Sequence, residues 1–234
     1  TPPPSSATTS PYPTDNRGDT PQATPGRTPA RNWEHRELPP PLGITTHASA
    51  PANTSPLRDA CRGPTDVEIG SGKGKFLNEL ALARPERNLL AVERSAKYHR
   101  LCCDRAARRG LENVRVIRTT GEDLLFRLLA EESVENFFVL FSDPWPKKRH
   151  HKRRFFKPEN VAAMHRALAP GGCLLVKSDH PGYSMIIAEV LSAASGFTTT
   201  DTEDAFAGLP QTGFEQKYLV DGREIHSFAL KKQG

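Results

Sequence analysis

The chain has 234 residues, of which 36% are hydrophobic and 25% are charged, and its formal net charge is +5. These values are typical of a globular protein with one domain and a tail, or with one large domain. The longest apolar runs, such as residues 137–141, are far shorter than the roughly 18 residues of a membrane-spanning helix, so no membrane association is expected.

Proline divides the chain into two parts. Of the 21 prolines, 14 lie between Pro2 and Pro64 and only seven lie in the 170 residues that follow. A segment rich in Pro, Ser and Thr cannot bury enough apolar surface to offset its ordering entropy, so we expect residues 1–62 to be disordered. Residues 63–234 are expected to form one folded domain.

The start of the chain and the cysteines indicate where the protein works. No apolar core of the kind found in secretory signals lies near the start, and the four cysteines form no Cys-x-x-Cys pair. We therefore expect reduced thiols and a cytoplasmic protein. An organellar location is the alternative, if the N-terminal segment is a transit peptide.

Positive charge is concentrated in one segment. Residues 147–154 carry six Lys or Arg and no acidic residue, whereas residues 1–64 have a net charge of only +1. The rest of the chain is slightly acidic, so the basic pI of about 9.1 is predicted to reflect one local patch.

The hydrophobic pattern from Thr65 onward predicts strands that alternate with helices. Four short apolar runs begin about 22–25 residues apart, and a fifth follows after a longer gap. Such alternation is typical of βαβ units and predicts an α/β fold with a doubly wound, mostly parallel sheet. The strand candidates are Val67–Ile69, Leu89–Val92, Val114–Ile117, Phe137–Phe141 and Cys173–Lys177.

Between these runs, apolar residues recur at helical spacing. Pro158 suits the first turn of a helix that we expect Pro170-Gly171-Gly172 to end. After a further helix, the segments Phe214–Val220 and Glu224–Leu230 predict a C-terminal antiparallel hairpin around Asp221-Gly222. Two sets are each predicted to share one helix face: Phe76, Leu77, Leu80 and Ala81; and Leu124, Leu125, Leu128 and Leu129. The helix that begins at Pro158 carries Val161, Met164 and Leu168, and the further helix contains Met185, Ile186, Ala188, Glu189 and Val190.

A glycine-rich loop follows the first strand in the order Glu68-Ile69-Gly70-Ser71-Gly72-Lys73-Gly74. A Walker loop and a dinucleotide fingerprint are both disfavoured, because Lys75 and Phe76 stand where those motifs require other residues. The loop is similar instead to the Glu/Asp-x-Gly-x-Gly-x-Gly turn of proteins that bind S-adenosylmethionine (SAM). Glu68, Gly70 and Gly72 are therefore candidate cofactor contacts, since glycines let a ligand approach the backbone closely.

The ends of the next three strands extend this prediction. Glu93 ends the second strand, 23 residues after Gly70, where a carboxylate can hydrogen-bond both hydroxyls of an adenosine ribose. Thr120 follows the third strand, where an adenine-binding turn is expected. Asp143 follows the most hydrophobic strand and is predicted to face the crevice at the carboxyl ends of the strands.

Asp143 also begins an unusual segment, Asp-Pro-Trp-Pro, which the basic run follows directly. The prolines stiffen the backbone, and Trp145 offers a flat face to a base. A basic run beside a predicted site indicates an electrostatic footprint for nucleic acid. Two adjacent histidines, His150 and His151, without a third ligand do not predict a metal site.

At this point the sequence resembles the bacterial tRNA (guanine-N7)-methyltransferases. The resemblance rests first on the segment Asp143–Arg154, DPWPKKRHHKRR, and covers roughly residues 65–232. Further matching segments, in chain order, are Glu68–Gly74, Ala91–Glu93, Leu168–Gly172, Ser178–Tyr183 and Thr212–Lys217. The resemblance implies a class I SAM-dependent methyltransferase that methylates N7 of guanine 46 in the variable loop of tRNA.

The same resemblance implies roles for individual residues. Glu68, Glu93 and Asp143 match the acids that contact SAM in the family, and Asp143 matches the catalytic residue. This sequence has Thr120 where the family frequently has Asp or Asn. The basic segment that usually precedes the domain in the family has no clear counterpart in the Pro-rich region. The residues that match substrate contacts are Lys147, Asp179, Thr212, Gly213, Phe214 and Glu215, and those that match the RNA-binding run are Arg149, His150, His151, Lys152, Arg153 and Arg154.

Guanine N7 carries a lone pair and no proton, so its methylation needs no general base. The site must hold N7 in line with the methyl group, and a carboxylate such as Asp143 can stabilise the positive charge that develops on guanine. Asp179 or Glu215 can accept hydrogen bonds from the guanine N1–H and amino group. We expect tRNA as the partner of a monomer or homodimer.

Two other functions remain open on the sequence alone. One is a SAM-dependent N-methyltransferase that acts on another nucleic acid or on a protein. The other is an inactive methyltransferase-fold protein that binds RNA, although the intact Glu68, Glu93 and Asp143 count against decay of the site.

Overall fold

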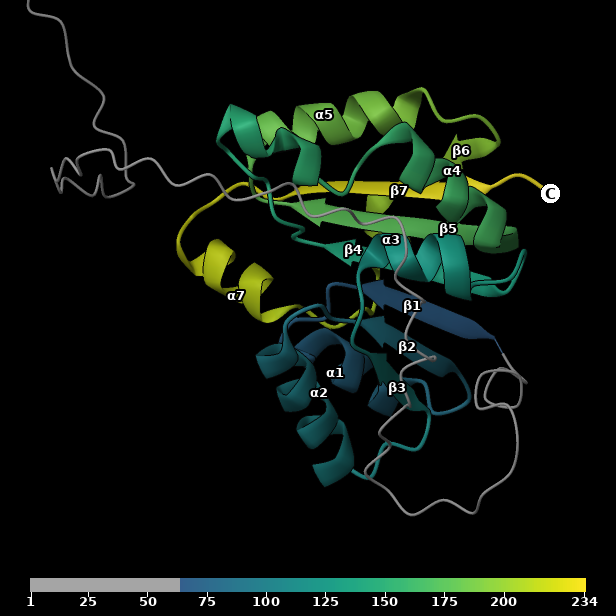
Figure 1. The fold of residues 1–234 in the computed structure, drawn as a ribbon, viewed down its shortest axis with the longest axis vertical. Coiled ribbons are helices and arrows are strands. Elements are labelled where there is room, and N and C mark those ends of the chain that lie inside the picture. The colour runs from purple at the N-terminus through teal and green to yellow at the C-terminus, as the bar shows by residue number, and fades with distance from the viewer. Residues whose placement is uncertain (1–63) are drawn as a thin grey trace, which may run out of the picture. The chain divides into compact units, whose positions relative to one another are not determined.

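The computed structural model describes residues 64–234, so the predicted disordered segment of residues 1–62 lies outside the described part. Within this part the strands form one seven-stranded sheet in the order β3-β2-β1-β4-β5-β7-β6 (Figure 1). Strands β1 to β5 are parallel, whereas β7 is antiparallel to β5 and β6. The predicted α/β fold with a mostly parallel sheet is confirmed. The strands are β1 (Thr65–Ile69), β2 (Asn88–Val92), β3 (Val114–Ile117), β4 (Val134–Leu140), β5 (Leu168–Ser178), β6 (Phe197–Thr199) and β7 (His226–Lys232).

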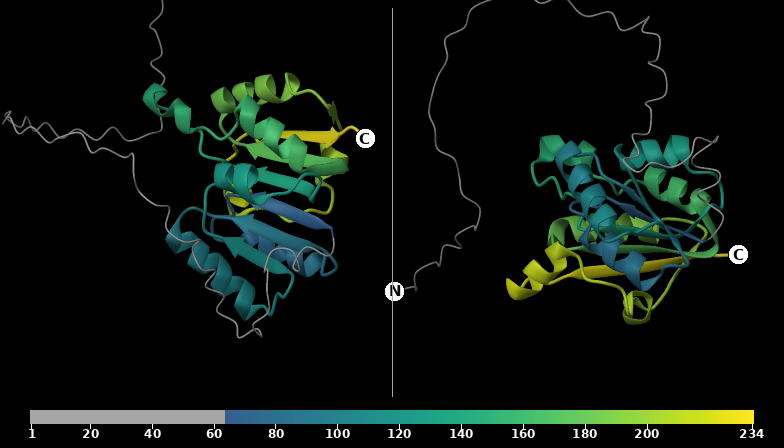
Figure 2. Two further views of the ribbon diagram at one scale, coloured as in Figure 1. Left: turned by 45° about the vertical axis from the view of Figure 1, so that its right-hand side comes forward. Right: turned by 90° about the horizontal axis from the view of Figure 1, so that it is seen from below.

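Helices cover both faces of this sheet (Figure 2). One face packs against η1, α4 and α5, and the other packs against α1, α2 and α6. The helical elements are α1 (Lys75–Ala83), α2 (Ala96–Arg108), α3 (Gly121–Asp123), the π-helical η1 (Leu124–Leu128), the 3-10 helix η2 (Lys148–Arg153), α4 (Pro158–Ala167), α5 (Pro181–Ser192), α6 (Thr202–Phe206) and α7 (Gly213–Val220).

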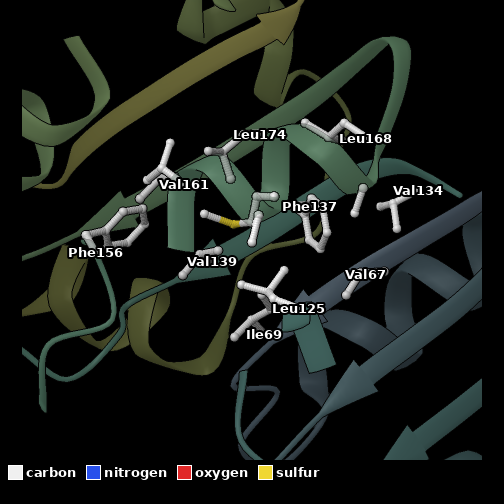
Figure 3. Packing of buried hydrophobic residues seen from close by; sticks show 14 of the residues in the cluster. Val67, Ile69, Leu125, Val134, Phe137, Val139, Phe156, Val161, Leu168 and Leu174 are labelled. Atoms are coloured by element: carbon white, nitrogen blue, oxygen red, sulfur yellow. The ribbon is translucent and has the colours of Figure 1, made fainter. Parts of the chain in front are cut away.

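The continuous apolar run of β4 follows from its central place in the sheet. Phe137 and Val139 enter the core on the side of α4, where Val161 packs (Figure 3). Phe138 and Leu140 face the opposite way, into the core beneath α1 and α2. A parallel strand that is buried on both faces has no polar side, so it reads as one hydrophobic run.

The apolar residues predicted for the first helix and for the helix beginning at Pro158 are buried. In α5, however, Met185 is 74% exposed, and the buried face consists of Tyr183, Ile187 and Leu191.

The residues predicted for the helix after β3 are buried only in part. Leu124 and Leu125 are fully buried, but Leu128 is 44% exposed. The turn is π-helical, with the Leu129 N–H donating to the Leu124 carbonyl at 3.1 Å. The wider spacing of a π-helix rotates Leu128 away from the face that an α-helix would give it.

The helix that begins at Pro158 ends earlier than predicted. Leu168 opens β5 and pairs with Val134 of β4, and residues 170–172 lie inside this strand rather than at a helix end. A Cβ at Gly172 would lie only 2.6 Å from the carbonyl oxygen of Glu135. Glycine is therefore used here for close approach of two backbones.

The prediction that residues 214–220 form the first strand of a C-terminal hairpin is wrong. Residues 214–220 form α7, because Thr212 and Glu215 make a capping box at its start. The Thr212 hydroxyl accepts from the Glu215 N–H at 2.9 Å, and the Glu215 carboxylate accepts from the Thr212 N–H at 3.4 Å. The antiparallel C-terminal strands are β7 and the short β6, which the sequence pattern did not predict.

Within residues 64–234, no helix combines the length and the apolar composition that crossing a membrane requires.

Candidate functional site

The predicted site residues converge because four parallel strands end at the same edge of the sheet. The glycine loop (residues 70–74) follows β1, Glu93 follows β2, Asp143 follows β4 and Asp179 follows β5. In Figure 1 the arrowheads of β1, β2 and β5 point toward the side on which α7 lies. This edge is where open α/β sheets bind their ligands.

The glycine loop leaves open space where a ligand can lie against the backbone. Gly70 and Gly72 have φ values of +85° and +53°, which side chains of L-residues rarely adopt. A Cβ built on either glycine meets nothing within 4 Å. Gly74 differs, because its Cβ would lie 2.3 Å from the sulfur of Cys102, so this glycine serves packing against α2.

Glu93 ties the end of β2 to the glycine loop. Its Oε2 accepts from the Gly72 N–H at 2.8 Å, and its Oε1 accepts from the Ser95 N–H at 2.7 Å. Each carboxylate oxygen has a second lone pair, so these bonds leave acceptor capacity for a ribose hydroxyl. The carboxylate is therefore held in one orientation beside the open part of the loop.

Glu68 lies beneath the loop and is almost completely buried. The pKa of its carboxyl is raised to about 8, chiefly by burial and also by the nearby charge of Glu93, while a hydrogen bond with the backbone of Leu77 acts in the opposite direction. Its Oε2 is buried without a hydrogen-bond partner among the described residues. A neutral Glu68 at pH 7 avoids the cost of a buried, unpaired charge.

The raised pKa of Glu68 is expected to make stability depend on pH. Between the ordinary value of 4.5 and about 8, the folded chain binds a proton that the unfolded chain has lost. The free energy of unfolding should therefore fall as pH rises through this window. In Glu68→Gln the free energy of unfolding should fall less over this pH window, as measured by urea unfolding. The control Glu189→Gln, at an exposed position, should show the same fall as the wild-type protein. An unchanged slope in Glu68→Gln would contradict the assignment.

Thr120 stands at the end of the neighbouring β3, but its hydroxyl is engaged locally. It accepts from the Asp123 N–H at 3.1 Å and so caps α3. Gly121, which follows, is buried against Phe155 and Ile69, and a Cβ there would lie within 2.9 Å of both side chains. The structure thus gives this turn a close-packed backbone, while the predicted adenine contact of Thr120 stays a prediction.

Asp143 lies in a loop whose backbone is held in an uncommon conformation. Phe141 and Trp145, two residues to either side of it, have φ values of +58° and +44°. Left-handed conformations at bulky residues cost free energy and persist where the surroundings enforce them, often at active sites. The Asp143 side chain is exposed and makes no hydrogen bond or ion pair within residues 64–234.

Arg154 supports the backbone of this loop. Its Nε donates to the Pro144 carbonyl at 2.7 Å, and its guanidinium lies 5.1 Å from the ring centroid of Tyr183. Arg154 is only 7% exposed, so the structure places it as a support of the loop rather than on the surface where an RNA phosphate would lie. No sequence signal distinguished Arg154, because it is one of six cations in the run.

The rest of the basic run forms η2 and faces solvent. Desolvation and the charges of Arg153, Arg149 and Lys147 lower the pKa of His150. Trp145 is half-buried, with Arg153 5.0 Å above its ring and the His150 ring 5.6 Å away, so one face of the indole is already occupied. Among residues 64–234, no group of three His, Cys, Asp or Glu side chains could hold a metal ion. The exposed cations are Lys147, Lys148, Arg149, Lys152 and Arg153.

The two predicted guanine acceptors each have a cationic partner that sequence reasoning missed. Arg223 donates to Asp179 at 2.9 Å, and Lys177 donates to Glu215 in a short, largely buried pair. Lys177 directly follows the apolar core of β5, and that place at a strand end was the one available signal for it. Each pair therefore restrains one of the two carboxylates.

An aromatic row connects α7 with the Asp143 loop. Phe214, which is 56% exposed, stacks on Tyr218 at 5.9 Å between ring centroids, and Tyr218 packs edge-on against Phe141 at 5.5 Å. Of the predicted substrate segment, Thr212 and Glu215 therefore build the helix, while Phe214 remains accessible to a ligand.

A family model described as "Putative methyltransferase" matches residues 62–228. Chains named tRNA (guanine-N(7)-)-methyltransferase are similar over most of their length. The chain from Nitrosococcus oceani is 35% identical over 209 residues, which cover 88% of this chain and 86% of the relative. The chain from Halorhodospira halophila is 38% identical over 174 residues, which cover 72% and 74%. The chain from Mycobacterium tuberculosis is 34% identical over 212 residues, which cover 86% and 80%.

Solved structures share the fold at much lower identity. The 16S rRNA methyltransferase KamB has a TM-score of 0.54 at 18% identity, with 75% of this chain and 90% of that chain covered. TrmN from Thermus thermophilus has a TM-score of 0.51 at 18% identity, with 75% and 46% covered. Likeness at this level shows the shared architecture alone.

Proposed function

Because the chain belongs to the tRNA (guanine-N(7)-)-methyltransferase family, we propose that it transfers the methyl group of SAM to N7 of a guanine in tRNA. Guanine 46 of the variable loop is the proposed target, on the resemblance of the segment Asp143–Arg154. One observation carries the proposal. An unpaired, exposed carboxylate, Asp143, is held at the ligand-binding edge of the sheet by a loop that leads directly into the exposed cations of η2.

The residues around the glycine loop fit SAM. Gly70 and Gly72 leave free space against the backbone, and Glu93 is fixed beside it with lone pairs available for ribose hydroxyls. The partnerless oxygen of Glu68 lies beneath the same loop, where a cationic ligand would favour the ionised carboxylate. These four residues would hold SAM, which supplies an activated methyl group when bound.

In the proposed reaction the protein positions the base and stabilises charge. N7 attacks with its own lone pair, so no side chain needs to remove a proton beforehand. Correct alignment of the reacting atoms is the main contribution that such a site can make. As the ring becomes cationic, the carboxylate of Asp143 offsets the developing charge from a fixed position.

Asp179 and Glu215 are proposed to recognise guanine. A guanine offers N1–H and amino donors, and both carboxylates have lone pairs beyond those used by Arg223 and Lys177. Adenine lacks both donors at these positions and would leave the carboxylates unsatisfied, which disfavours it. Phe214 supplies an exposed ring against which a base can stack.

The proposal also covers partners and location. We propose tRNA as the macromolecular partner, with Lys147 and the exposed cations of η2 at its phosphates, and a cytoplasmic site of action. The protein is proposed to act as a monomer or homodimer.

A methyl-transfer assay tests the function. The full chain is incubated with methyl-labelled SAM and tRNA transcripts, either with guanine 46 or with adenine in its place. We expect label in the first transcript only, mapped to N7 by borohydride–aniline cleavage. Label at an exocyclic amine, or equal label in both transcripts, would overturn the proposal.

A further inference from the structure

A cleft lies between α1 and α2, beside the end of the glycine loop. It has a volume of about 410 Å³ and is lined by Gly74, Lys75, Asn78, Glu79, Arg105, Arg108 and Arg109. Apart from Gly74 at the end of the glycine loop, none of these residues belongs to the predicted site. The cleft therefore needs an explanation of its own.

The lining of the cleft is strongly positive. Lys75 approaches Glu79 at 4.0 Å and balances the single acidic side chain, which leaves three guanidinium groups. Arg105 is held in place by donating to the Lys73 carbonyl at 2.8 Å. Arg108 and Arg109 are exposed, and their side chains make no hydrogen bond or ion pair within the described residues. Such a set of donors matches a phosphate group.

Asn78 provides a second and independent sign of a ligand. Asn78 is one of the lining residues and is only 1% exposed, yet neither its Nδ2 nor its Oδ1 has a hydrogen-bond partner in the described part of the chain. Unsatisfied buried amides are rare because each costs free energy of desolvation. A ligand that accepts from the Asn78 amide would remove part of this cost.

The cleft is one end of a basic surface along α2. Residues 94–109 contain six Lys or Arg and only one acidic residue, as many cations as the run at residues 147–154. The expectation of a single basic patch is therefore incomplete. Helical spacing places Lys97, Arg100 and Arg108 on one exposed face, which leads from the end of β2 toward the cleft.

We propose that this cleft binds a phosphodiester of the tRNA backbone, at a distance from the methylated guanine. The inference rests on the proposed function. RNA bound by η2 near Asp143 would also be bound by the cations of this cleft, so a long, folded RNA would contact the protein at two places. A free phosphate ion has the same chemistry, and the experiment separates the two sources.

The test compares Arg108→Gln/Arg109→Gln with a control of equal charge change, Arg115→Gln/Lys231→Gln, in the full chain. Both control residues are exposed and lie in β3 and β7 rather than in the cleft. Binding of labelled tRNA is measured against salt, together with SAM binding. We expect the cleft variant to bind tRNA about 10-fold more weakly near 0.1 M salt and to lose about two units of salt slope, with SAM affinity unchanged. The control should match the wild-type protein.

Two further arms complete the test. Asn78→Leu removes the unsatisfied amide and should weaken tRNA binding without lowering the melting temperature. If Asn78 had only a structural role, tRNA binding would stay unchanged. Inorganic phosphate alone should neither stabilise the wild-type protein selectively nor displace tRNA at millimolar concentration.

Unchanged tRNA affinity and salt slope in the cleft variant would overturn the proposal. So would phosphate stabilisation that disappears in Arg108→Gln/Arg109→Gln while tRNA binding persists. Because binding is read without methyl transfer, failure of the proposed function, seen as no N7-methylguanine, is distinguishable from failure of the cleft.

Discussion

Replacing Asp143 by alanine is expected to lower the rate of methyl transfer to tRNA by at least about 100-fold. Its carboxylate is the one acid at the end of β4, and it is exposed within a loop that Arg154 fastens. An exposed side chain without partners contributes little to stability, so the melting temperature should change little. Single-turnover rates with saturating SAM and tRNA measure the effect on the transfer step.

Two further variants make this prediction specific. Asp143→Asn keeps the shape but removes the negative charge, so it should lose nearly as much activity if charge stabilisation is the role of the residue. Glu189→Ala removes an exposed carboxylate from α5 and should keep full activity. Near wild-type turnover in Asp143→Ala would refute the catalytic assignment.

Neutralising the exposed face of η2 is expected to produce the second large effect. The variant Lys148→Gln/Arg149→Gln/Lys152→Gln removes three cations that face solvent and support no neighbouring segment. Affinity for tRNA should fall more than 10-fold near 0.1 M salt, and the salt slope should decrease by about three units, because fewer counterions are released. Binding isotherms between low and moderate salt measure both quantities.

Arg154 should behave differently from its neighbours in the sequence. Arg154→Ala removes the support of the Pro144 carbonyl and the contact with Tyr183, so it should lower the melting temperature and the transfer rate. The salt dependence of tRNA binding should be nearly the same in Arg154→Ala as in the wild-type protein. The placement of these cations would be contradicted if the salt dependence of tRNA binding decreased in Arg154→Ala. It would also be contradicted if that salt dependence stayed constant in the η2 variant.

Much of the fold and of the site was predictable from local pattern. Apolar runs such as residues 137–141 identify strands buried on both faces, and their spacing identifies the crossover helices. Parallel strands present their carboxyl ends at one edge, so Glu93 and Asp143 were expected to lie at the same edge. Asp179 was expected at the site only from the resemblance of the segment Ser178–Tyr183. Local glycine chemistry likewise marked the loop at residues 70–74.

The errors of prediction occurred where a contact distant in sequence, or a local cap, decides the outcome. Leu168 reads as a helical residue until its pairing with Val134 places it in β5. Residues 214–220 were predicted to form a hairpin strand before Asp221-Gly222, but the capping box of Thr212 with Glu215 begins a helix there.

The sequence by itself determined the class of fold, the ligand-binding edge and the acids at the ends of the second and fourth strands, because the strands and their ends follow from periodicity. Only the tertiary structure decided which charges are accessible. It buries Arg154 beneath the Asp143 loop, pairs Asp179 with Arg223 across 44 positions, and places the cations of α2 beside the unsatisfied Asn78. The reason is physical: the state and role of a charged side chain depend on its burial and its partners, and partners distant in the sequence are brought together only by packing.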